Sequence, residues 1–306
     1  MRAELRLLGA GGEPVDLRRT INSHGLVDLP PMRLVDDERA LEVTLPLPRG
    51  RPRTVRVSQG RPGFAVVTVA GRAPSPSHEE RIRSAVSRVL RLDEDLSSFY
   101  ERAAADPDLV WAGAGAGRMI RSPTVFEDVV KTICTTNCAW SATERMVGAL
   151  VEHLGERASN APAEGPYGRA FPTPAAMAAA DEGFYRDVMR AGYRGPYLRT
   201  LATSVLEGSV DLETLGRADA AALPDEELAA RLLALPGVGP YAAAHIMMML
   251  GRYSGLILDS WTRPKYASLN GGRPVKDSTI ERRFRRYGPY AGLAFWMHLT
   301  RDWVAD

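Results

Sequence analysis

The segment from Leu235 to Arg263 combines a glycine turn with a carboxylate that follows Gly239 by twenty residues. It reads LPGVGPYAAAHIMMMLGRYSGLILDSWTR. Asp259 comes directly after the apolar run GLIL, so we expect its carboxylate at the edge of a buried segment. A carboxylate beside apolar neighbours is costly unless it is paired or takes part in chemistry. Asp259 is therefore a candidate catalytic residue, and its alternative role is the N-cap of a helix over SWTRPKYAS.

The turn LPGVG lies between two predicted helices. The first, PDEELAARLLAL, is amphipathic, and the second, PYAAAHIMMML, begins at Pro240, a favoured first residue of a helix. Gly237 and Gly239 lack Cβ atoms, so they can adopt turn conformations and let a DNA backbone approach. N–H groups at the start of the second helix would then face a phosphate. The pattern indicates a helix-hairpin-helix that binds DNA through Gly237, Val238 and Gly239, although a sharp turn between packed helices would look the same.

The stretch LPGVGPYAAAHIMMML…LILDSWTR resembles the hairpin and catalytic aspartate of helix-hairpin-helix DNA glycosylases, notably 3-methyladenine DNA glycosylase II and 8-oxoguanine DNA glycosylase. The stretches ICTTNCAWSATERMV, AGYRGPYL and YGPYAGLAFWMHL resemble further segments of the 8-oxoguanine enzymes. The resemblance covers most of residues 120–300. It implies that Asp259 is catalytic and that Asn137 enters the gap left by an extruded base. It also implies Na⁺ or K⁺ on the backbone carbonyls of Leu235 and Val238, with no other cofactor required.

One departure from the 8-oxoguanine enzymes concerns their lysine, which stands two residues after the second hairpin glycine. Tyr241 occupies that position here, and the chain has only three lysines: Lys131, Lys265 and Lys276. Covalent amine catalysis needs a nitrogen nucleophile held in the pocket. The sequence therefore favours a monofunctional enzyme, in which Asp259 stabilises the cationic sugar while water completes the hydrolysis.

Three functions stay open. The first is a base-excision-repair glycosylase that removes a damaged base from double-stranded DNA, with alkylated purines preferred because their glycosidic bonds are already labile. The second is an 8-oxoguanine-type glycosylase without the catalytic lysine. The third is a non-catalytic helix-hairpin-helix module in which Asp259 is only a cap. Asn137 and the GPYAG segment favour oxidised guanine, whereas Tyr241 favours alkylated purines.

A target base must leave the duplex before an enzyme can act on it. We therefore expect aromatic walls near Asp259, and the candidates are Tyr241, Trp140 and Trp261. Trp296 lies in a nearly all-apolar stretch and is interpreted as core. His245, on the helix after the hairpin, is interpreted as a packed histidine.

Basic residues offer candidate phosphate contacts. The cluster ERRFRRYG predicts DNA contacts by Arg282 and Arg286, and Arg118 and Arg121 are weaker candidates for the same role. The net charge of +2 neither requires nor excludes a nucleic-acid partner. Most of the positive charge is arginine, which is typical of a GC-rich genome.

Composition sets the remaining expectations. Two cysteines, Cys134 and Cys138, cannot supply an iron–sulfur cluster, and their spacing indicates small buried or wall residues. No run of eighteen apolar residues indicates a membrane span, and the N-terminus does not resemble a signal peptide. We expect a cytoplasmic, nucleoid-associated monomer that makes no contact with membranes.

The predicted fold class is α+β. Short β-branched runs, LEVTLPL, TVRVS and FAVVTVAG, predict a small antiparallel sheet domain over residues 1–75. Two helical subdomains follow, one formed by 76–122 and 221–306 with the hairpin, the other by 123–220, and the active-site cleft is expected between them. A helix is expected to begin at Ser122 and Pro123, to break near Thr135–Asn137 and to end at Gly155.

Overall fold

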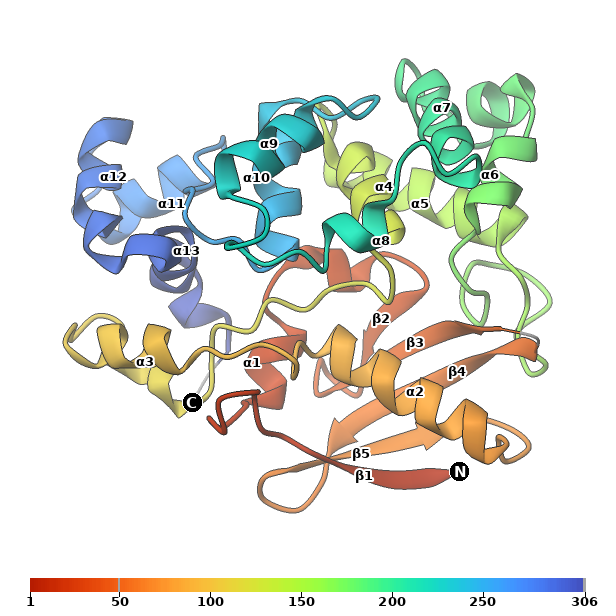
Figure 1. Cartoon of the computed structure of the whole chain (residues 1–306), viewed down its shortest axis with the longest axis horizontal. Coiled ribbons are helices and arrows are strands. Elements are labelled where there is room, and N and C mark those ends of the chain that lie inside the picture. Colours follow the sequence, from red (N-terminus) through yellow and green to blue (C-terminus); the bar gives the residue numbers. More distant parts are fainter. Residues whose placement is uncertain (49, 305–306) are drawn as a thin grey trace.

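The computed structural model describes residues 1–48 and 50–304 and begins with an antiparallel sheet (Figure 1). The strand order is β1-β5-β4-β3-β2. Along β5 the side chains of Ala65, Val67 and Val69 are buried and those between them are more exposed, which is the alternation of a sheet with one face in a core. Three strands match the predicted runs, whereas the first and second were not predicted. The strands are β1 (Arg2–Arg6), β2 (Met32–Val35), β3 (Ala40–Leu47), β4 (Gly50–Gln59) and β5 (Phe64–Val69).

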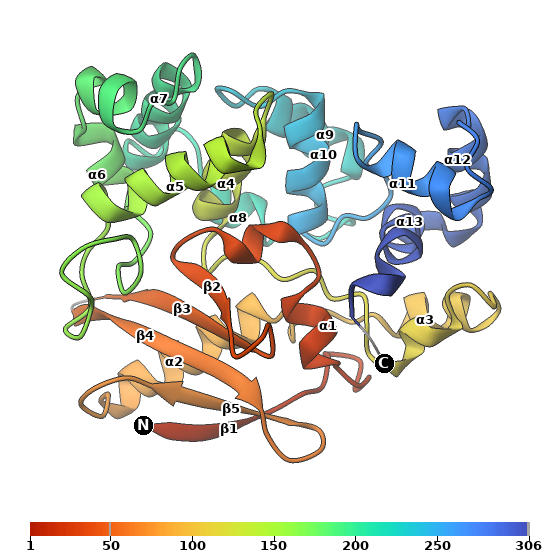
Figure 2. The ribbon, with the colours of Figure 1, turned by 180° about the vertical axis from the view of Figure 1, so that it is seen from behind.

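Helix α2 (Pro76–Val89) lies across one face of this sheet (Figures 1 and 2). Its apolar side, Ile82, Val86 and Val89, is buried in the same core as the strands. Short helices α1 (Leu17–Ile21) and η1 (Gly25–Asp28) connect β1 to β2. The packing thus groups α2 with the sheet, while the subdomain boundaries expected from the sequence stay a prediction.

A first group of helices follows the sheet. Helix α4 begins at Val125, two residues later than predicted, because Thr124 and not Ser122 caps it, accepting the Glu127 N–H at 3.2 Å. The predicted break and the predicted end at Gly155 are confirmed. The elements of this group are α4 (Val125–Thr135), α5 (Trp140–Leu154), α6 (Pro174–Ala179), the π-helical η3 (Phe184–Val188), α7 (Arg194–Leu206), α8 (Leu212–Leu215) and α9 (Asp225–Leu233).

A second group of helices packs around a separate apolar core. Helix α10 joins the two groups, since Ala242 and Ile246 are buried in the first core and Met248 and Met249 in the second. The hairpin helix therefore stands at the junction of the helical layers (Figure 2). The elements are α3 (Ser97–Ala104), η2 (Val110–Ala114), α10 (Pro240–Met249), α11 (Thr262–Leu269), α12 (Asp277–Phe284), η4 (Arg285–Tyr290), α13 (Ala291–Thr300) and η5 (Arg301–Trp303).

The predicted α+β class is confirmed, with one antiparallel sheet followed by helices. Within residues 1–48 and 50–304, no helix has the length and apolar character needed to cross a lipid bilayer.

Candidate active-site cleft

Two cavities meet at Asp259. The outer cavity, about 940 Å³, is lined by the hairpin, by the α4–α5 turn and by α7. The inner cavity, about 380 Å³, reaches between the helical layers to the segment before η1. Four residues line both: Thr135, Cys138, Tyr241 and Asp259. The other residues of the inner cavity are His24, Gly25, Leu26, Met119, Thr132, Trp140, Thr143, His245, Met248, Met249, Trp261 and Trp296.

The carboxylate of Asp259 is fixed by the chain that follows it. Its Oδ1 accepts the N–H groups of Trp261 at 2.9 Å and Thr262 at 2.7 Å. The Thr262 hydroxyl accepts the Asp259 N–H in return, at 2.8 Å. Asp259 therefore caps the turn that leads into α11, whose own N-cap position is Trp261, two residues later than expected. This cap uses only Oδ1, so Oδ2 is left for other partners. The basic atom nearest to Oδ2 is Nε2 of His245, at 3.9 Å. Cap and catalyst are compatible roles for this residue.

The two hairpin glycines differ in what they require. Gly237 has φ +78°, in the left-handed region, and a Cβ there would lie 3.0 Å from Cβ of Tyr197. Gly239 has an ordinary φ of −98°, and apart from Gly239 itself and its two chain neighbours no described residue has an atom within 4 Å of the position its Cβ would take. Gly237 therefore serves the turn, and Gly239 leaves the outer cavity open beside the start of α10. No side chain in the described part of the chain caps α10, so its first N–H groups are available to an anion.

Asn137 lines the outer cavity together with the hairpin. Its φ is +47°, and its Nδ2 donates to the Tyr193 hydroxyl at 3.1 Å. Tyr193 and Tyr197 are exposed and pack edge to face, with ring centroids 6.4 Å apart. Exposed tyrosines beside a cavity are suited to stacking on bases. Neither tyrosine was predicted as a site residue, although both lie in the AGYRGPYL stretch.

Aromatic side chains form the walls of the inner cavity, and all three predicted pocket residues, Tyr241, Trp140 and Trp261, are among them. Trp296 was interpreted as core and is indeed buried, but it also lines this cavity. Its Nε1 donates to the Ser23 carbonyl at 2.8 Å, and its ring lies 5.5 Å from that of Trp261. Burial, followed by the charge of Asp259, raises the pKa of Tyr241, so its hydroxyl is neutral.

Two histidines also line the inner cavity. His24 accepts the Leu26 N–H on Nδ1 at 3.2 Å and bonds to the Ile120 carbonyl through Nε2, which fixes it as a neutral donor. His245 packs on Tyr241, with ring centroids 4.4 Å apart. Burial lowers the pKa of each histidine to about 4. The interpretation of His245 as merely packed is thus incomplete, since its ring faces the cavity beside Asp259. Nothing in the sequence connected His24 to this site.

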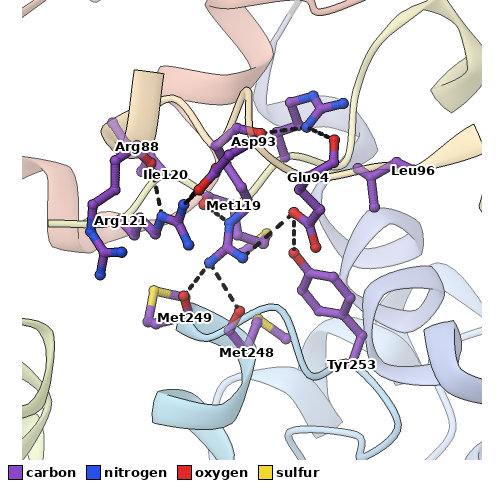
Figure 3. A network of polar contacts seen from close by, with 12 residues as sticks. Arg88, Asp93, Glu94, Leu96, Met119, Ile120, Arg121, Met248, Met249 and Tyr253 are labelled. Atoms are coloured by element: carbon purple, nitrogen blue, oxygen red, sulfur yellow. Dashed lines mark hydrogen bonds and ion pairs between the residues drawn. The ribbon is translucent and has the colours of Figure 1, made fainter. Parts of the chain in front are cut away.

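A buried network holds the far end of α10 (Figure 3). Arg91 donates to the backbone carbonyls of Met119 at 2.9 Å, of Met248 at 3.5 Å and of Met249.

The predicted phosphate contacts of Arg118 and Arg121 are wrong. Both side chains are buried and paired with carboxylates, Arg118 with Glu13 and Arg121 with Asp93 at 2.5 Å. Buried guanidinium groups need such partners, which leaves these two unavailable to DNA.

The other predicted contacts stay predictions. Arg282 is exposed on α12, whereas Arg286 forms an ion pair with Asp106. Neither arginine is among the residues that line the two cavities. At the hairpin, the Leu235 carbonyl accepts the Val238 N–H at 3.2 Å. Cys134 is buried and Cys138 lines both cavities, as their spacing indicated.

No protein-family model and no curated protein matches the chain. Solved structures do. A 3-methyladenine DNA glycosylase from Archaeoglobus fulgidus superposes with TM-score 0.73 at 19% identity, over 99% of this chain and 100% of that one. The apo 8-oxoguanine glycosylase/lyase of Clostridium acetobutylicum superposes with TM-score 0.70 at 20% identity, over 97% of this chain and 94% of that one. The same enzyme with double-stranded DNA containing cytosine opposite 8-oxoguanine gives 0.65, over 92% of each chain. The chain therefore resembles the helix-hairpin-helix DNA glycosylases in structure and has their fold.

Proposed function

We propose that this protein is a monofunctional DNA glycosylase that flips a damaged base out of duplex DNA and hydrolyses its N-glycosidic bond. The observation that carries the proposal is the place of Asp259, whose carboxylate lines both the outer and the inner cavity. The outer cavity offers a phosphate the uncapped start of α10. The inner cavity offers a flipped base aromatic walls. The anomeric carbon would then lie between them, next to a carboxylate that stabilises positive charge.

The environment of the lysines supports hydrolysis by water over amine catalysis. Lys131 is buried, pairs with Glu127 at 2.7 Å and donates to the Leu29 carbonyl. Lys265 pairs with Asp302 at 2.8 Å. Among the described residues that line the two cavities, none is a lysine. A Schiff base with the sugar needs a free amine in the site, so we infer that this chain releases the base without cutting the strand.

The chemistry of the inner cavity favours an alkylated purine as the target. Its described lining contains three tryptophans and no lysine or arginine. Aromatic faces attract a cationic ring, and a cationic base leaves without a proton donor. The two histidines, with each pKa lowered to about 4, are neutral at pH 7 and do not oppose that charge.

We further propose that Na⁺ or K⁺ binds the Leu235 and Val238 carbonyls and neutralises a phosphate there. Main-chain carbonyls are hard oxygen donors suited to such ions, and a carbonyl oxygen has two lone pairs. The Leu235 carbonyl uses one of these for the Val238 N–H and keeps the other. A duplex affinity that is the same in Na⁺, K⁺ and a bulky organic cation at equal ionic strength would contradict this.

The test is base release from duplexes that carry a single 7-methylguanine, a single 8-oxoguanine or no damage. Products are compared before and after hot alkali, which cleaves abasic sites. We expect release of 7-methylguanine, with strand breaks only after alkali. Release of 8-oxoguanine alone would transfer the proposal to the oxidised-guanine branch. Breaks without alkali would refute the monofunctional mechanism, and binding without any release would favour a non-catalytic module.

A further inference from the structure

The ring of His245 packs on Tyr241, but this packing leaves one ring nitrogen without a partner among the described residues. Its Nε2 is buried, and no described residue provides it with a hydrogen-bond partner. A buried polar nitrogen without a partner destabilises the fold, so such an atom points to a ligand or a solvent molecule. Position 245 lies one turn after Tyr241 on the same helix, which places its ring in the inner cavity next to Asp259.

The distance between the two side chains suits one water molecule. Nε2 of His245 lies 3.9 Å from Oδ2 of Asp259, too far for a direct hydrogen bond. A water that donates both protons through ordinary hydrogen bonds of about 2.8 Å joins two acceptors that are roughly 4 Å apart. Oδ1 is already occupied by the N–H groups of Trp261 and Thr262, so Oδ2 is the oxygen left to accept.

We propose that His245 is a second catalytic residue, which together with Asp259 binds the water that attacks the anomeric carbon. This inference rests on the proposed glycosylase function and adds the proton acceptor to it. The tautomer with its proton on Nδ1 presents the Nε2 lone pair to the water. The water oxygen forms a bond to C1′, and the C1′–N bond breaks with its electron pair leaving on the base. One water proton passes to Nε2 and then to solvent, so Asp259 stays ionised beside the cationic sugar.

The surroundings of His245 suit this role. The titratable groups that face it are Tyr241 from α10, Asp259 from the segment before α11, Cys138 from the α4–α5 turn and His24 from the segment before η1. Asp259 is the only carboxylate among these four residues, and it stabilises the imidazolium that proton transfer creates. Burial lowers the pKa of His245 to about 4, so the ring begins the reaction as a neutral acceptor.

The test compares His245→Phe and His245→Ala with the native chain in single-turnover excision of 7-methylguanine. Phenylalanine keeps a ring against Tyr241 and removes the unpartnered nitrogen, so we expect it to fold at least as stably. Loss of a general base lowers rates by about 10²–10⁴-fold, so each variant should lose at least a hundredfold. Duplex affinity should change less than twofold. Added imidazole should restore part of the rate to His245→Ala, because it fits the space left by the ring, but not to His245→Phe.

The control is His153→Ala, an exposed histidine on α5 outside both cavities, which should excise at the native rate. A His245→Phe rate within twofold of native would overturn the inference. So would a slow rate that is matched by an equal loss of duplex affinity, since His245 would then bind the base and not the water. If the native chain releases no base, the proposed function itself fails, and that result is separate from either outcome for the variants.

Discussion

Replacing Gly237 by alanine should destabilise the whole fold through one turn. Its φ of +78° costs a residue with a Cβ about 1–2 kcal/mol. The new methyl group would also lie 3.0 Å from Cβ of Tyr197 and 3.4 Å from Cγ2 of Ile133, so the turn would have to shift. Alanine also lowers the conformational entropy of the unfolded chain, which stabilises the fold by about 0.4–1 kcal/mol. We expect the free energy of unfolding to fall by about 1–2 kcal/mol in total.

Gly239→Ala is the matched comparison, two residues away in the same hairpin. Its φ of −98° is open to any residue, and the described residues leave the position of its Cβ free. We expect stability within about 0.5 kcal/mol of native. The methyl group would instead occupy the outer cavity beside the start of α10. Duplex affinity should therefore fall about tenfold, which corresponds to roughly 1.4 kcal/mol.

The assay measures urea unfolding by circular dichroism and duplex binding by fluorescence anisotropy, for both variants at one salt concentration. Duplex with an abasic-site analogue serves as the probe. Equal stability of Gly237→Ala and the native chain would refute the assignment of strain to that turn. Native affinity in a stable Gly239→Ala would refute the approach of DNA to the hairpin.

Two further predictions concern buried groups. Burial lowers the pKa of His24 from 6.5 to about 4, so below pH 6.5 the unfolded chain binds a proton that the folded chain does not. The free energy of unfolding is therefore highest above pH 6.5 and falls on acidification, by about 2 kcal/mol at pH 5. In His24→Gln this contribution is absent, so the urea midpoint should depend less on pH than in the native chain. Arg91→Lys should cost about 2–4 kcal/mol in urea unfolding, because a single ammonium group cannot replace the separate nitrogens through which the buried guanidinium bonds three carbonyls. Exposed Arg186→Lys should cost less than about 0.5 kcal/mol. A steeper or unchanged pH dependence, or a stable Arg91→Lys, would contradict these accounts.

Local patterns in the sequence predicted much of the candidate site. The G-x-G spacing and the apolar run before Asp259 are contiguous features, and the structure places Tyr241 and Trp261 in one cavity with that carboxylate. Strands β3, β4 and β5 were also predicted, since their β-branched runs are bounded by Pro, Gly and Arg.

The remaining features depend on contacts between distant segments. His24 reaches the inner cavity only because η1 packs against the helices, through a bond to Ile120 that spans 96 residues of sequence. Arg118 looked like a surface cation, but the fold buries it against Glu13. Strand β1 escaped prediction because its five residues alternate polar and apolar types too briefly, and pairing with β5 stabilises it.

The central claim is that the Asp259 carboxylate drives base release, and Asp259→Asn tests it most directly. An asparagine Oδ1 can still accept the N–H groups of Trp261 and Thr262, so the cap and duplex binding should be kept. Asp187→Asn, at an exposed ion pair outside both cavities, is the control. We predict that single-turnover release of 7-methylguanine falls at least a thousandfold in Asp259→Asn with native affinity, while the control is unchanged. Release at the native rate by Asp259→Asn would show that this carboxylate is only a helix cap.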